Sequence, residues 1–144
     1  MQQANLSQAK LKSANLTGTD LRNTNLNGAS LVEVILTDAD LSYANLPTGD
    51  FNRALLDHAN LTGVNLSRAC LNHAFLQEAN LVGADLHEAN LRVTNLEGAN
   101  LVGADLSRAD LTSANLLNAN LLGADLSNAI LVGATMPNGT KRKW

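Results

Sequence analysis

The sequence has few of the residues on which most small proteins build a core. Its 144 residues include one cysteine and two prolines, and aromatic residues make up only 3% of the chain. The single cysteine, Cys70, excludes an internal disulfide, which favours a reducing compartment. Since bulky rings are scarce, the core must be filled by smaller and more uniform side chains.

The chain also lacks strong charge of either sign and any long apolar segment. Its formal net charge is −3, which fits neither a basic nucleic-acid-binding surface nor the dense negative charge of a strong DNA mimic. No run of about 18 apolar residues suggests a membrane span, and no signal peptide is visible, so we expect a cytoplasmic protein. No phosphate-binding, zinc-protease or nucleophile motif is found, and we expect neither an enzyme nor a cofactor nor a bound metal.

A repeat of five residues dominates what is present. Its central residue, position i, falls at residue 6 and at every fifth residue to 136, which gives 27 units. Position i is leucine in 25 units, and Phe51 and Met136 fill the other two. Position i−2 is alanine in 21 units, and position i−1 is Asn or Asp in 19. The phenylalanine centre shares its unit with Gly49, the only glycine at i−2, which indicates volume compensation.

A period of five fits neither a helix nor a long strand. Leucines five apart would rotate about 140° round a helix, and in a strand they would alternate between faces. Within Ala-x-Leu, however, the alternation is strand-like, and the two residues that follow are rich in Gly, Ser, Thr and Asn, as turns are. The pattern therefore predicts a chain that bends after every short inward segment and coils around stacked leucines.

Columns of similar residues recur every 20 positions, which favours four units per coil. One column runs through Asn5, Asn25, Asn45 and Asn65 and continues as Asp85, Asp105 and Asp125. Another aligns Gly63, Gly83, Gly103 and Gly123.

The unbroken run of Ala-(Asn/Asp)-Leu-x-x units from Ala4 to Asn138 resembles the pentapeptide-repeat family. The resemblance implies an all-β solenoid, a right-handed quadrilateral β-helix with i and i−2 inside and essentially no α-helix. The 27 units would make about 6.75 coils of four pentapeptides. We expect a short lead at 1–3, the β-helix at 4–138 and a basic C-terminal tail at 139–144, in which Trp144 either covers the last layer or frays.

Three large apolar residues replace Asn or Asp at i−1 in one column: Ile35, Leu55 and Phe75. They lie at an outward position of three successive coils. We predict that this apolar strip is an interaction surface, because contiguous exposed apolar patches often mark interfaces. The alternative is that the strip lies in a shallow groove or beneath the tail.

The column Asp85, Asp105 and Asp125 places like charges about 4.8 Å apart, the spacing of neighbouring strands. A bound cation, a basic partner or hydrogen bonds at the corners could relieve the repulsion. The column Asp38, His58 and Glu78 is interpreted as a surface charge ladder rather than a metal site. His87, between Ser67 and Ser107 in its column, shows no metal-ligand company.

These features predict a non-catalytic structural or protein-interaction scaffold whose partner is a protein of unknown identity. Direct binding to nucleic acid or membrane is not expected, and self-association through the coil ends or the apolar strip is an alternative use of the surface. The alternative function is a DNA mimic that binds DNA gyrase or another type II topoisomerase, as some members of the family do. The modest charge and the basic Lys141-Arg142-Lys143 depart from that pattern.

Overall fold

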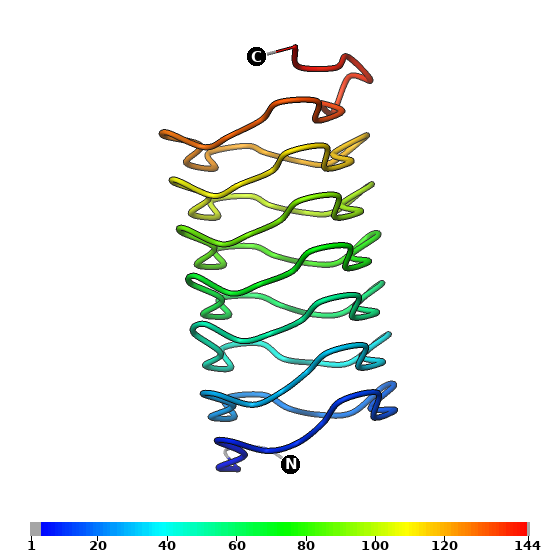
Figure 1. Ribbon diagram of the computed structural model, residues 1–144, viewed down its shortest axis with the longest axis vertical. Coiled ribbons are helices and arrows are strands. Elements are labelled where there is room, and N and C mark those ends of the chain that lie inside the picture. The colour runs from blue at the N-terminus through cyan, green and yellow to red at the C-terminus, as the bar shows by residue number, and fades with distance from the viewer. Residues whose placement is uncertain (1–3, 144) are drawn as a thin grey trace.

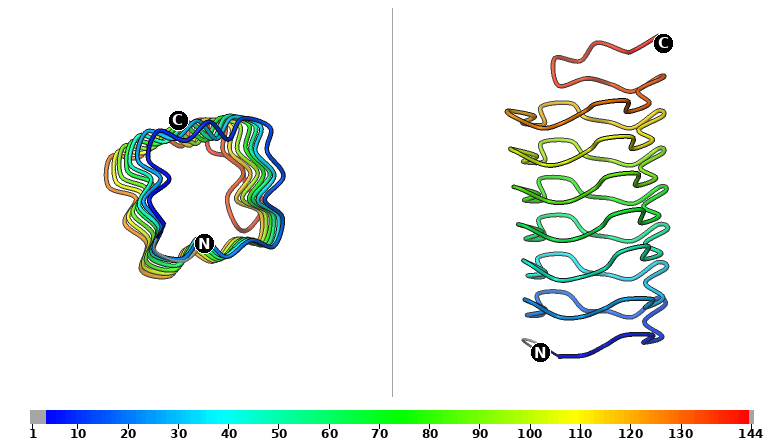
Figure 2. Two further views of the ribbon diagram at one scale, coloured as in Figure 1. Left: turned by 90° about the horizontal axis from the view of Figure 1, so that it is seen from below. Right: turned by 90° about the vertical axis from the view of Figure 1, so that its left-hand side faces the viewer.

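The computed structural model describes residues 4–143, which form one continuous coil rising from the N-terminal to the C-terminal end (Figure 1). The described residues contain no helix, and β-pairing is confined to isolated single-residue bridges instead of extended strands. Each parallel bridge joins position i−1 of one unit to position i−1 of the unit 20 residues later, as Leu55 does with Ile35 and Phe75. One turn of the coil therefore takes 20 residues, and successive coils superpose in the end-on view (Figure 2).

Each unit ends in a β-turn, which is what bends the chain. The N–H that follows the turn donates to the carbonyl of position i, as in the 3.0 Å bond from Ala9 to Leu6. Position i+2 has a φ between 55° and 74° in every unit from residue 8 to residue 133. A positive φ at the third turn residue is typical of type II turns and explains the glycines found there. The prediction that i+1 and i+2 are turn positions is confirmed.

The side chains of the Asn and Asp residues at i−1 stabilise the turn that follows. In 18 of the 19 units that have Asn or Asp there, the side-chain oxygen accepts a hydrogen bond from the N–H of position i+1, at 2.8–3.4 Å. The exception is Asn45, whose i+1 residue is Pro47 and has no N–H to donate. The consensus at i−1 is thus a local hydrogen-bonding requirement of the turn.

The core is the column of residues at i with the small residues at i−2 around it. From Leu21 to Leu116 every residue at position i is at most 1% exposed, including Phe51. At the two ends the corresponding leucines are only partly buried. A Cβ atom added to Gly49 would lie 2.9 Å from Cε2 of Phe51, so the glycine does make room for the ring, as the sequence predicts.

The C-terminal tail folds back on the last coil. Lys141 forms an antiparallel bridge with Thr135, and Arg142 donates its N–H to the carbonyl of Ala134 at 2.9 Å. In the end-on view the last segment lies within the outline of the coils (Figure 2). The expectations for residues 1–3 and Trp144 fall outside the described residues. None of the described residues belongs to a helix long and apolar enough to cross a membrane.

Val93 is a strained position in this regular backbone. It has a φ of 57° although it is β-branched, a combination that costs free energy, and its side chain is 47% exposed. Asparagine tolerates this φ, so Val93→Asn is expected to raise the free energy of unfolding by about 1 kcal/mol in chemical denaturation. Val82→Asn, at a turn position without positive φ, is the control and should give no such gain. A lower stability of Val93→Asn would show that the backbone strain is not limiting.

Candidate functional site

The apolar strip occupies one wall of the coil, with its three residues bridged in register. Ile35 and Leu55 are half-buried, whereas the ring of Phe75 is 46% exposed. Because Phe75 offers no oxygen to the turn, the N–H of Gln77 bonds to the carboxylate of Asp57 in the preceding coil at 2.9 Å. The strip thus takes the place of turn-stabilising polar residues and ends in a projecting aromatic ring.

A hollow of about 360 Å³ lies beside that ring. In the column of Phe75, the next residue is the smaller Asn95, which leaves space above the ring. The hollow is lined by Arg53, His73, Ala74, Phe75, Val93 and Asn95. We call it the aromatic hollow.

A second hollow of about 660 Å³ lies on the same corner. Its lining is more polar and comprises Val32, Glu33, Asn52, Arg53, Asn72, His73, Asn90, Arg92 and Val93. We call it the polar hollow. Arg53, His73 and Val93 line both hollows, which are therefore adjacent, and we call these three residues the corner ridge.

The two arginines beside the ridge differ in how firmly they are paired. Arg53 has its guanidinium nitrogen 3.9 Å from the carboxylate of Glu33, and its side chain is 70% exposed. Arg92 bonds more closely to Asp110, at 3.1 Å. Within residues 4–143, the side chain of His73 makes no hydrogen bond or ion pair. Arg53 and His73 are therefore available to a molecule that approaches the corner, whereas Arg92 is held by Asp110.

Asn72, which lines the polar hollow, has one polar atom without a partner among the described residues. The amide nitrogen of Asn72 donates to the sulfur of Cys70 at 3.1 Å, and that of Asn52 donates to the same sulfur at 3.4 Å. The amide oxygen of Asn72 is buried and has no hydrogen-bond partner among the described residues. This oxygen can accept a further hydrogen bond.

The acidic column Asp85, Asp105 and Asp125 lies on a different wall and is bridged in register. Each carboxylate accepts a hydrogen bond from the N–H two residues later, at 3.1, 2.8 and 2.8 Å respectively. Hydrogen bonds from the side chain and the N–H of Ser127 lower the pKa of Asp125 below its ordinary value. Corner hydrogen bonds, one of the expected forms of relief, therefore stabilise the charged carboxylates.

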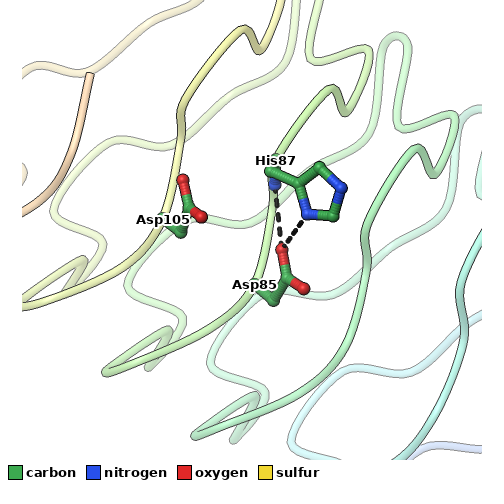
Figure 3. Close-up of side chains that lie close together, drawn as sticks. All are labelled: Asp85, His87 and Asp105. Carbon is green, nitrogen blue, oxygen red and sulfur yellow. Dashed lines mark hydrogen bonds and ion pairs between the residues drawn. The ribbon is translucent and has the colours of Figure 1, made fainter. Parts of the chain in front are cut away.

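His87 lies beside two carboxylates, those of Asp85 and Asp105, so the interpretation that it has no potential metal-ligand neighbours is wrong. Its Nδ1 atom lies 2.7 Å from the carboxylate of Asp85, and one atom each of Asp85, His87 and Asp105 lie within 4.8 Å of one another (Figure 3). The signal was present in the sequence, because i−1 and i+1 flank an inward residue and so share the outer side. Two carboxylates and an imidazole could hold a divalent cation. All three side chains are partly exposed, however, and the hydrogen bond to Asp85 accounts for the histidine without one.

Two other columns are surface charge ladders. His58 lies 3.5 Å from Glu78, with both side chains more than half exposed. Glu88 accepts hydrogen bonds from Arg68 at 2.8 Å and from Arg108 at 3.2 Å. These bonds, that from Arg68 first, lower the pKa of Glu88 below its ordinary value. The ladders join neighbouring coils and need no bound ion.

The repeat itself identifies the family. The family model described as pentapeptide repeats matches in 8 copies, over residues 1–38, 35–72, 59–98, 69–108, 90–128 and 104–138. This chain belongs to the pentapeptide-repeat family. The resemblance drawn from the Ala-(Asn/Asp)-Leu-x-x units is thereby confirmed.

Several solved structures of pentapeptide-repeat proteins are similar to this chain. Rfr23 from the cyanobacterium Cyanothece 51142 is 34% identical with a TM-score of 0.40, and the match covers 81% of this chain and 90% of that one. HetL from Nostoc sp. strain PCC 7120, involved in heterocyst differentiation regulation, is 29% identical with a TM-score of 0.24, covering 99% and 93%. QnrB1, a plasmid-mediated fluoroquinolone resistance protein, is 20% identical with a TM-score of 0.42, covering 93% and 70%. A search of curated proteins finds no match.

Proposed function

We propose that this pentapeptide-repeat protein is a non-catalytic, cytoplasmic scaffold that presents an ordered surface to a protein partner. The observation that supports this most directly is the apolar strip, in which three successive coils replace turn-stabilising residues by Ile35, Leu55 and Phe75. Exposing an aromatic ring in water brings the free protein no stability, whereas covering it by a partner does.

The proposed shape of the scaffold is a right-handed quadrilateral β-helix of about 6.75 coils. The 20-residue spacing of the bridges and the turn after every fifth residue support four walls per coil. Such a rod holds the outward columns at fixed spacing, and its side-chain ladders brace neighbouring coils. A partner can therefore bind a rigid pattern of side chains without the entropic cost of ordering the scaffold.

Phe75→Asn tests the interface without disturbing the rod. Asparagine is the usual residue at this position and offers the N–H of Gln77 a local acceptor in addition to Asp57, so the unfolding midpoint should stay close to that of the wild type. We expect the variant to lose a protein that wild-type bait recovers from lysate of the native host. Leu122→Asn, which removes a 74% exposed side chain on another wall, should keep that protein. If Phe75→Asn recovers the same proteins as the wild type and sediments alike, the strip is not an interface.

The alternative function, a DNA mimic for a type II topoisomerase, predicts that the protein inhibits supercoiling by DNA gyrase. Duplex DNA carries one charge per about 1.7 Å of its axis, while this chain has a net charge of −3 and intersperses Arg68 and Arg108 among its acids. We therefore expect no inhibition of gyrase supercoiling by micromolar protein. Inhibition that disappears with Asp105→Asn would favour the mimic and make the acidic column its contact surface.

A further inference from the structure

We propose that the two hollows beside Phe75 form a docking site for an acidic protein segment, one that carries an apolar side chain next to a carboxylate. This inference rests on the proposed scaffold function and specifies the chemistry of the partner. It is carried by the aromatic hollow, the charges of the corner ridge and the adjacency of the two hollows.

The aromatic hollow supplies the apolar half of the site. Its volume of about 360 Å³ lies within the range of ligand pockets and suits one large apolar side chain. Its apolar lining consists of the exposed Phe75 and Val93 and the buried Ala74. An apolar side chain placed here removes both exposed residues from water, which is the main driving force of association.

The corner ridge supplies the charged half. Of the charged side chains that line the two hollows, Arg92 is paired with Asp110 at 3.1 Å, whereas Arg53 has only the 3.9 Å contact with Glu33. Arg53 is the group free to engage, because its contact with Glu33 is long and its side chain is mostly exposed. A carboxylate of the partner can accept two parallel hydrogen bonds from this guanidinium, with His73 beside it as a further donor.

The arrangement of the hollows favours an extended segment over a compact ligand. The two hollows share Arg53, His73 and Val93 and are therefore adjacent, so an extended peptide that passes over these residues reaches both. A peptide also brings backbone N–H donors to the polar hollow, where the oxygen of Asn72 has no partner. Since the terminal torsion of asparagine is broad, that amide can turn toward an entering donor.

The test is selection of random short peptides displayed on phage against the immobilised 144-residue protein. The enriched peptides are expected to contain Asp or Glu next to Leu, Ile or Phe. The best peptide, synthesised with a fluorescent label, should bind Phe75→Asn and Arg53→Glu about tenfold or more weakly than the wild type in fluorescence anisotropy. Enrichment of basic peptides, or of none above a bare-matrix selection, would overturn the proposal.

Matched variants separate recognition from folding. Arg53→Glu places at this corner the residue that the same column already holds at Glu33, and Arg53→Gln removes only the charge if the first variant unfolds. Arg108→Glu, at the same position of the repeat on another corner, should bind the peptide as the wild type does. Equal affinity of the wild type, Arg53→Glu and Arg53→Gln would refute the role of the ridge.

The same variants distinguish this inference from the scaffold function. If the host protein lost by Phe75→Asn is retained by Arg53→Glu, the scaffold stands and the acidic segment is wrong. If Phe75→Asn abolishes only self-association in ultracentrifugation, and the selected peptide does not compete with it, the occupant is a second copy of the chain and the inference fails.

Discussion

Leu66→Ala is expected to lower the free energy of unfolding by about 2–5 kcal/mol, toward the upper end of that range. Leu66 is fully buried in the middle of the rod, in one column with Leu46 and Leu86. Its N–H bonds to the carbonyl of Asp85 at 2.8 Å, and Leu46 bonds to Asn65 at 2.9 Å. The coils on both sides are therefore fixed by backbone hydrogen bonds and cannot collapse into the cavity.

Chemical denaturation followed by circular dichroism measures this loss, and position along the rod provides the control. Leu121→Ala removes the same atoms from the last coil, where the leucine is already partly exposed, and should cost clearly less. A central lesion in a repeat protein can also uncouple the two halves, so a second unfolding step in Leu66→Ala alone would agree with this view. Equal losses at the two positions would mean that the terminal coil is covered in solution.

The sequence predicts the interior better than the surface because the interior repeats. The period of five assigns i and i−2 to the inside, and Leu21, Leu66 and Leu116 are buried as that period requires. The recurrence at 20 correctly places Ile35, Leu55 and Phe75 in one column. These conclusions need only the backbone geometry that every unit shares.

The hollows could not be predicted in the same way. They depend on the difference in size between Phe75 and Asn95 and on the directions that Arg53 and His73 take along the corner. A column shows which residues are neighbours, but not how far their side chains reach. The pairing of His87 with Asp85 could have been predicted, because positions i−1 and i+1 of a single unit lie on the same side of the chain.

Gly49→Ala is expected to destabilise the protein by about 1–3 kcal/mol, although alanine is the usual residue at this position. The new Cβ would lie 2.9 Å from Cε2 of Phe51 and 3.1 Å from the carbonyl oxygen of Leu46. Gly49 has no positive φ, so alanine adds no strain of that kind, and the contact with the ring is the closer of the two. In the double variant with Phe51→Leu, which restores the usual Ala-x-Leu unit, most of this loss should disappear.

A double-mutant cycle measures that coupling as the difference between the loss in the double variant and the sum of the two single losses. Gly83→Ala is the matched control, because no atom lies within 4 Å of its added Cβ while its φ is 63°. It should cost stability through the backbone alone, and Phe51→Leu should not reduce that cost. Additive losses for Gly49→Ala and Phe51→Leu would refute volume compensation, since the two residues interact in the folded coil only through the space they share.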